Sequence, residues 1–169
     1  MSVSEHKKKQ SAVKCMVITV SDTRTEETDK SGTTIKKLLL ERNHQISDYK
    51  IVRDEKEAIR QAVESGIAKK DVEAVIINGG TGMAKRDVTI ETVSPLFEKD
   101  MPGFGEIFRT LSYKEDIGSA AILSRATAGV ANNTMVFSIP GSTGAVRLAL
   151  HKLILPELSH IIKEIKKDL

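Results

Sequence analysis

The chain alternates between short apolar runs of strand length and longer amphipathic stretches with helical spacing. Lys14–Val20, Gln45–Val52 and Ala74–Ile77 are rich in β-branched residues and have the length of strands. Between them, apolar residues recur at helical intervals over residues 35–39 and 58–67, with charged residues on the opposite face. The repeated order of strand, helix and strand predicts an α/β fold built from right-handed βαβ units and a mostly parallel sheet.

The second half of the chain predicts a hairpin followed by a long C-terminal helix. Thr127–Val130 and Thr134–Ile139 flank the turn-like residues 131–133, which is the pattern of two antiparallel strands. Apolar residues then recur at helical spacing from Gly144 onward, and Pro156 should break that helix into two segments. The predicted sheet therefore gains an antiparallel element late in the chain.

Capping residues and prolines predict where the other helices begin. Asp54, followed three positions later by Glu57, predicts the N-cap of the second helix. A further helical stretch begins near Val88, and Pro95 should kink or restart it. Gly103 and Gly105 are expected to open a short helix around Phe108 and Leu111.

Length and composition favour a single folded domain. The chain has 169 residues, of which 40% are hydrophobic and 29% charged, so it can form one substantial core and is not biased toward disorder. No apolar run approaches the ~20 residues of a membrane-spanning helix, and the polar N-terminus lacks the apolar centre of a signal peptide. These features predict a cytoplasmic protein with no membrane partner. We expect residues 1–11 to form a mobile basic tail and residues 12–169 to form the domain.

The charge distribution argues against nucleic-acid binding. The net charge is +3, but residues 1–10 carry three Lys and one Glu, or +2, which leaves only +1 for the rest of the chain. There is no Trp, and Tyr and Phe are few, so neither a basic stripe nor a stacking platform is predicted. The single cysteine, Cys15, lies in an apolar run and is expected to be a buried hydrophobic residue. Four scattered His residues give neither zinc-ligand spacing nor a Ser-His-Asp arrangement.

Four loops leave the carboxyl ends of predicted strands, which is where ligands bind in open α/β sheets. The first contains Ser21, Asp22 and Arg24 and closes on residues 29–32, where hydroxyls and a helix start suit a phosphate. Turn and capping chemistry explains the same residues equally well. The second loop contains Asp54, for which helix capping and catalysis are both open.

The third loop is the most informative, because it places three glycines within four residues after a buried strand. Such a backbone allows close approach to an anion, and the residues that follow add a hydroxyl, two cations and a carboxylate. The relevant residues are Gly79, Gly80, Thr81, Gly82, Lys85, Arg86 and Asp87. The carboxylate of Asp87 suits either a divalent ion or the cap of the next helix.

The fourth loop, Pro140–Thr143, again joins a strand to a helix start. Ser124 and Arg125 are expected nearby, where the guanidinium suits a phosphate. Residues 104–108, including Glu106, are candidates for the side of the pocket, although Phe108 is better explained as core.

Taken together, these motifs resemble the molybdopterin-binding family of molybdenum-cofactor synthesis, over a region from about Ala12 to the C-terminus. The GGTG sequence followed by RDVT is the specific part of the resemblance, and Pro140–Val146 is most similar to one branch of the family. The matching stretches are Thr19–Asp22, Asp54–Glu55, Gly79–Gly82, Arg86–Thr89, Met101–Glu106, Leu123–Arg125 and Pro140–Gly141.

The resemblance implies a three-layer α/β/α sandwich and a homo-oligomer, either a trimer or a hexamer. It also implies an activity: AMP is transferred from ATP to the terminal phosphate of molybdopterin, with Mg²⁺. Asp54 and Asp87 match the family's catalytic carboxylates, with Asp87 as the expected Mg²⁺ ligand. The expected substrate-binding residues are Ser21, Asp22, Gly79, Gly80, Thr81, Gly82, Arg86, Glu106, Ser124, Arg125, Pro140, Gly141 and Ser142.

Two departures from the family pattern keep an alternative open. Members with firm adenylyl-transfer activity tend to have Pro-Gly-Asn-Pro or Pro-Gly-Gln-Pro where this chain has Pro140–Thr143, and Pro where it has Ile90. A changed loop on the nucleotide side would leave pterin binding intact while weakening the use of ATP. The alternative is a non-catalytic molybdopterin-binding or assembly protein of the same pathway.

Overall fold

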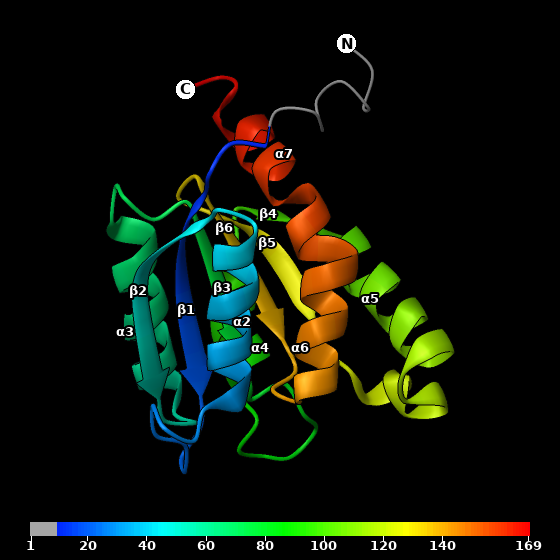
Figure 1. Cartoon of the computed structure of the whole chain (residues 1–169). Helices are drawn as coiled ribbons and strands as arrows, with labels where there is room; N and C mark the ends of the chain where they lie inside the picture. The colour runs from blue at the N-terminus through cyan, green and yellow to red at the C-terminus, as the bar shows by residue number, and fades with distance from the viewer. Residues whose placement is uncertain (1–9) are drawn as a thin grey trace.

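The computed structural model describes residues 10–169, which fold around one six-stranded sheet (Figure 1). The strand order is β2-β1-β3-β6-β5-β4, and β1, β2, β3 and β6 run parallel to one another. β5 pairs antiparallel with both β6 and β4. The strands are β1 (Lys14–Val20), β2 (Gln45–Val52), β3 (Ala74–Asn78), β4 (Lys99–Asp100), β5 (Thr127–Ala131) and β6 (Thr134–Ile139).

Helices cover both faces of the sheet, so the molecule is the expected three-layer α/β/α sandwich (Figure 1). One apolar core lies between the sheet and α2, α5, α6 and α7, and a second lies between the sheet and α3 and α4. The helices are α2 (Lys30–Glu41), α3 (Lys56–Ala68), α4 (Thr89–Val93), α5 (Pro102–Glu115), α6 (Thr143–Ala149) and α7 (Leu155–Lys166).

Most predicted elements are confirmed. The predicted hairpin is present, and its two loop residues, Asn132 and Asn133, both have positive φ (47° and 57°), as a tight two-residue turn requires. Pro95 restarts the helix after α4 as a 3₁₀ turn, Ser94–Leu96. The helix predicted as short over residues 103–111 is longer, Pro102–Glu115, and a second 3₁₀ segment follows at Gly118–Leu123.

The C-terminal helix corrects one prediction, because Pro156 does not break it. The chain stays helical from α6 to α7 through a π-helical segment, Leu150–Ile154, and Pro156 lies in the first turn of α7. In a π-helical segment each amide bonds the carbonyl five residues back instead of four, so the hydrogen-bond pattern just before Pro156 differs from that of an α-helix. The proline ring is tolerated in the first turn of a helix.

The first described residues, from residue 10 to the start of β1, and the C-terminus lie at the amino edge of the sheet, away from the four loops (Figure 1). Of the predicted mobile tail, residues 1–9 fall outside the described residues. Ser11 accepts a hydrogen bond from the Ser159 hydroxyl of α7 (2.7 Å), and the domain boundary at residue 12 stays a prediction. Over residues 10–169, no helix has the length and apolar character needed to cross a bilayer.

The topology places a crevice at the carboxyl ends of β1 and β3. From β1 the chain moves outward to β2, then crosses back to β3 on the other side of β1. The loops after β1 and β3 therefore diverge at this point, which is where open α/β sheets bind ligands.

Candidate functional site

A small pocket occupies this switch point. Its volume is about 170 Å³, and it brings the loops after β1, β3 and β6 together with the first turn of α2. The lining side chains comprise three hydroxyls, one amide, one guanidinium, the Asp29 carboxylate and one valine. The lining residues are Thr19, Val20, Ser21, Arg24, Asp29, Ser31, Asn78, Gly79 and Gly141.

A buried polar network lies beneath the pocket and is centred on Asp29. This side chain is only 2% exposed and caps α2 by accepting the Gly32 amide (2.9 Å). Its second oxygen accepts the hydroxyls of Thr19 (2.6 Å) and Tyr49. Burial, and then the Asp29 carboxylate, raise the pKa of Tyr49. The network fixes the start of α2 against β1 and β2.

Two buried polar residues of this region, Thr19 and Asn78, were not among the predicted site residues. Asn78 ends β3, and its amide donates to the Thr19 hydroxyl (2.9 Å), which joins β3 to the network. Both side chains are buried, and both are polar residues near the ends of otherwise apolar strands. That interruption of an apolar run is the signal that could have identified them.

The glycine-rich loop has the backbone geometry that only glycine adopts readily. Gly79 and Gly80 have φ of 98° and 67°. A Cβ at Gly79 would lie 2.4 Å from the Val20 carbonyl oxygen, and one at Gly80 would lie 2.1 Å from the Thr89 hydroxyl. The Thr89 hydroxyl donates to the Gly79 carbonyl (2.9 Å), so the start of α4 holds this loop.

Arg125 holds the same loop from the other side. Its guanidinium donates to the carbonyl oxygens of Thr81 (3.1 Å) and Gly82 (2.6 Å) and forms an ion pair with Glu91 of α4. These guanidinium donors bind carbonyl oxygens of the loop. The contact of Arg125 with a phosphate therefore stays a prediction. The neighbouring Ser124 has a buried hydroxyl with no hydrogen-bond partner among the described residues, as a ligand-binding group would have.

Three aspartates converge beside the glycine-rich loop, one from each of the first three loops. The Asp54 amide donates to Asp22 (3.1 Å), and the Ala84 amide donates to Asp87 (3.1 Å). Partial burial, and then the charges of Asp22 and Asp87, raise the pKa of Asp54, while Arg86 opposes this shift. The structure thus brings together Asp22, Asp54, Arg86 and Asp87 as the sequence predicted.

The capping roles considered for two of these aspartates are wrong. The N-cap of α3 is Glu55, one residue beyond Asp54, and no side chain caps that helix end. The N-cap of α4 is Val88, and the Asp87 carboxylate turns back to the Ala84 amide instead. The carboxylate of Asp54 is therefore not used as a helix cap.

The donor chemistry of this cluster fits Mg²⁺, which prefers carboxylate oxygens. Asp87, the expected Mg²⁺ ligand, belongs to this cluster. Within residues 10–169, however, no group of three acidic, His or Cys side chains could hold a metal ion, so the Mg²⁺ site stays a prediction.

The fourth loop contacts both the first and the third. The Ser31 hydroxyl donates to the Gly141 carbonyl (2.6 Å). A Cβ on Gly141 would lie 3.2 Å from Gly79 Cα, so the backbones of the two loops approach closely. Ser142 caps α6 by accepting the Ala145 amide (3.3 Å). Pro140 and Gly141 thus belong to the site, while the Ser142 side chain already serves a helix.

Glu106 lies apart from this pocket. It is exposed on α5 and lines a separate hollow of about 360 Å³ beside β5, together with Asp100 and Arg109. Phe108 is core, as expected, and Phe104 is also buried, with its ring 5.2 Å from that of Phe137. The chain alone does not bring Glu106 to the other predicted site residues.

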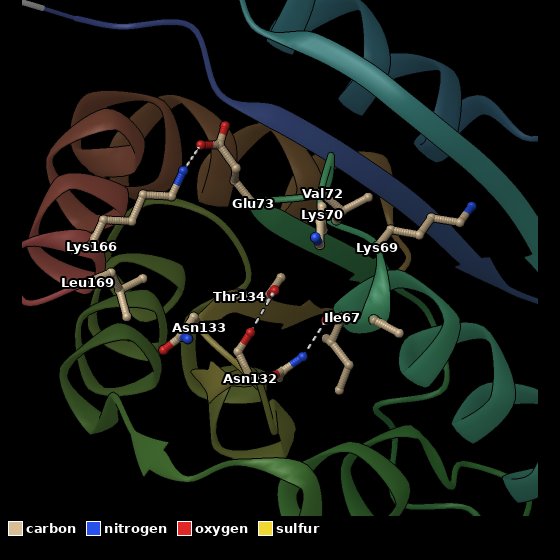
Figure 2. A pocket seen from close by; sticks show the side chains of 11 residues that line it. Ile67, Lys69, Lys70, Val72, Glu73, Asn132, Asn133, Thr134, Lys166 and Leu169 are labelled. Atoms are coloured by element: carbon tan, nitrogen blue, oxygen red, sulfur yellow. Dashed lines mark hydrogen bonds and ion pairs between the residues drawn. The ribbon is translucent and has the colours of Figure 1, made fainter.

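Another hollow, of about 310 Å³, lies at the opposite edge of the sheet from the candidate site (Figure 2). Several of its polar groups bind one another: Lys166 pairs with Glu73, and the Asn132 amide donates to the Ile67 carbonyl (2.8 Å). None of the predicted site residues lines it. Cys15 is also remote from any site chemistry, since it is fully buried and burial raises its pKa to about 12.

Comparison with known proteins gives the family. Residues 16–160 match the family described as "Probable molybdopterin binding domain". The chain belongs to this family. It is 61% identical over 169 residues to molybdenum cofactor biosynthesis protein B of Bacillus subtilis, covering 99% of each chain. This similarity confirms the prediction from Pro140–Val146, since it places the chain in the branch of molybdenum cofactor biosynthesis protein B.

Solved structures of the family have the same fold. A crystal structure of a molybdenum cofactor biosynthesis protein B superposes with a TM-score of 0.92 at 57% identity, covering 94% of this chain and 99% of that one. The tungsten cofactor synthesizing protein MoaB from Pyrococcus furiosus superposes with a TM-score of 0.83 at 40% identity, covering 92% and 98%. The family's molybdopterin-binding fold is therefore present over nearly the whole chain.

Proposed function

We propose that this protein binds molybdopterin and transfers AMP from ATP to its terminal phosphate in the presence of Mg²⁺. The observation that carries the proposal is the convergence of Asp22, Asp54 and Asp87 beside the glycine-rich loop at the switch point. Family membership supplies the ligand class, molybdopterin.

The pocket size supports an assignment of which part of molybdopterin enters it. A volume of about 170 Å³ is below the ~300 Å³ at which pockets begin to enclose a whole organic ligand. It suits a phosphate, for which the Ser21 hydroxyl and the guanidinium of Arg24 are available at the lining, whereas the Ser31 hydroxyl already donates to the Gly141 carbonyl. The fused pterin rings then lie outside the pocket.

In the proposed reaction a phosphate oxygen of molybdopterin attacks the α-phosphorus of ATP. The bond from that phosphorus to the oxygen bridging to the β-phosphate breaks, and pyrophosphate leaves with the electron pair. The protein's part is positioning and charge neutralisation. The glycine-rich loop brings backbone amides close to the anions, Asp87 would hold the cation, and Asp54 is the second catalytic carboxylate. Mg²⁺, when bound, neutralises the charge on the phosphates.

The test is product formation with purified protein, molybdopterin, ATP and Mg²⁺, detected as adenylylated molybdopterin. Asp87→Asn should lower turnover about 100-fold, because a metal-binding charge is lost. The asparagine keeps an oxygen that can accept the Ala84 amide, so we expect the loop to stay folded. Asp71→Asn, an exposed aspartate at the opposite edge of the sheet, is the matched control and should keep full activity.

The fourth loop supports a second candidate, a non-catalytic molybdopterin-binding or assembly protein. Ser142 caps α6, and Pro140–Thr143 lacks the Asn-Pro or Gln-Pro ending of the active relatives. Molybdopterin binding without any product, in the wild-type protein, would favour this candidate and exclude adenylyl transfer.

We also propose that the protein is a homo-oligomer. Of the eight large hydrophobic side chains that are exposed over residues 10–169, five lie between positions 107 and 123, on α5, the 3₁₀ segment after it and the turn that joins them. Such a concentration of exposed apolar surface is typical of an interface. These residues are Ile107, Tyr113, Ile117, Ile122 and Leu123.

A further inference from the structure

The pocket at the switch point has two charged side chains among the described residues that line it, Arg24 and Asp29. Both oxygens of the Asp29 carboxylate accept hydrogen bonds from the network beneath the pocket, but the side chain still places negative charge there. A phosphate monoester carries up to about two negative charges at neutral pH, so Asp29 repels it. Arg24 is the lining side chain that offsets this repulsion.

The first loop holds the guanidinium of Arg24 beside the pocket. Its Nη1 donates to the carbonyl of Thr28 (3.2 Å), which directly precedes Asp29. This contact uses one of the five N–H donors of a guanidinium and leaves the others for an anion. The guanidinium of Arg125, by contrast, donates to three carbonyls of the glycine-rich loop and pairs with Glu91.

Ser21 supplies a second donor at the same lining. Its Oγ accepts the amides of Thr23 (3.2 Å) and Arg24 (3.1 Å), so the hydroxyl proton is left to donate. Further along the loop, the Thr25 amide donates to the Thr28 hydroxyl (2.8 Å). The loop is therefore folded before a ligand arrives, which lowers the entropy cost of binding.

We propose that Arg24 makes this site selective for a phosphate monoester: its guanidinium binds the terminal phosphate of molybdopterin, with the Ser21 hydroxyl as the second donor. A pterin without the phosphate gains nothing from Arg24. Arg24 lies outside the stretches of the chain that match the family. The inference rests on the proposed function, since it assumes that the phosphate of molybdopterin enters the pocket.

The test compares the binding of molybdopterin and of its dephosphorylated form to the full-length protein, by anaerobic calorimetry without ATP or metal. The wild type should bind the phosphorylated form about 10-fold to 100-fold more tightly, because charge-assisted hydrogen bonds form only with the phosphate. Arg24→Gln should remove this preference and leave the affinity for the dephosphorylated form within about twofold, because that form does not use the guanidinium charge.

Two further variants separate recognition from charge and from folding. Arg24→Lys keeps the charge without the planar fork and should retain part of the preference. Lys30→Gln removes the same charge from an exposed position in the first turn of α2 that does not line the pocket, and it should keep the wild-type preference. Arg24 is exposed, so the circular dichroism spectrum of each variant should match that of the wild type.

Several outcomes would overturn the inference. They are a preference that persists in Arg24→Gln, an equal loss in Lys30→Gln, which would mean that only net charge matters, and a wild type that binds both forms equally. Equal weakening of both ligands in Arg24→Gln would also overturn it, because Arg24 would then support the loop without recognising the phosphate.

The assay for adenylylated molybdopterin judges the proposed function separately. Product formation by Arg24→Gln with an unchanged KM for molybdopterin would reject the role of Arg24 and leave adenylyl transfer standing. Loss of the phosphate preference in Arg24→Gln, together with no product from the wild type, would reject adenylyl transfer and leave the role of Arg24 in binding standing.

Discussion

At the scale of single residues, many polar side chains at the carboxyl edge of the sheet stabilise the loops that carry the site. Arg125 donates to loop carbonyls, Thr89 fixes Gly79, Ser31 fixes Gly141, and Asp29 caps α2. A buried carbonyl without a partner is costly, so these bonds hold the loops in one conformation. Residues whose donors are committed in this way are better described as supports than as ligands.

Arg125 provides the clearest prediction at this scale. Arg125→Lys should lower the free energy of unfolding by about 1–3 kcal/mol, because an ammonium cannot reach the carbonyls of Thr81 and Gly82 and also pair with Glu91. Chemical denaturation measures the change. Arg60→Lys, on an exposed face of α3, is the control and should change stability by less than about 0.5 kcal/mol. Equal effects of the two substitutions would show that the loop does not depend on this guanidinium.

The sequence did not predict which polar residues stabilise the loops and which are free to bind a ligand. The types of side chain at the site could be predicted, since carboxylates, glycines and hydroxyls follow the strands. Their partners could not, because Arg125 meets Thr81 and Gly82 only through the fold, across more than forty positions of the chain. The same holds for Asp54, whose cap position passed to Glu55 because local backbone angles decide the cap.

At the scale of elements, patterning predicted the strands that are buried on both faces. β1 and β6 begin and end where the apolar runs do, because a helix covers each side of the sheet. β4 was missed, since two residues have no measurable periodicity. The π turn after α6 was missed because periodicity does not distinguish it from an α-helix, and it is this turn that keeps the chain helical up to Pro156.

The junction between α2 and β2 makes stability depend on pH. His44 is buried, and its Nδ1 accepts the Val13 amide (3.1 Å), which requires a neutral ring. Burial, and then the charge of Arg42, lower its pKa below the usual 6.5. The unfolded chain thus binds a proton more readily than the folded chain, so stability falls as the pH drops below about 6.5 towards the folded-state pKa.

The expected size of this effect is at most about 1.4 kcal/mol per pH unit, the limit for one proton. Urea denaturation at pH values between about 7.5 and about 5 measures how the free energy of unfolding depends on pH. The slope of that dependence should be smaller for His44→Gln than for the wild type. His151→Gln, at an exposed position, should keep the wild-type slope. Identical slopes in all three proteins would mean that His44 is not the group responsible.

At the scale of the whole molecule, the topology brings most of the predicted site residues together but leaves one of them, Glu106, apart. The switch point between β1 and β3 gathers loops from positions 21, 54, 79–87 and 141, which the βαβ order alone predicted. Glu106 is the exception, since α5 holds it beside β5 in a separate hollow. The same helix belongs to the region with the exposed apolar side chains, so a neighbouring subunit packed there would cover the surface next to Glu106.

The proposed oligomer depends on that apolar region, so a charge placed in it should separate the subunits. Ile122 is 83% exposed and Leu123 is 57% exposed; a double substitution to Glu would bury two carboxylates in the interface, at a cost on the order of 3–5 kcal/mol or more. Sedimentation should show the mass falling from a multiple of the chain mass to that of one chain. Leu40→Glu, on α2 and 56% exposed, adds a charge at another exposed apolar position and should leave the mass unchanged. A monomeric wild type, or an unchanged mass in the double variant, would exclude residues 107–123 as the interface, whereas dissociation with a retained fold would place a subunit boundary beside Glu106.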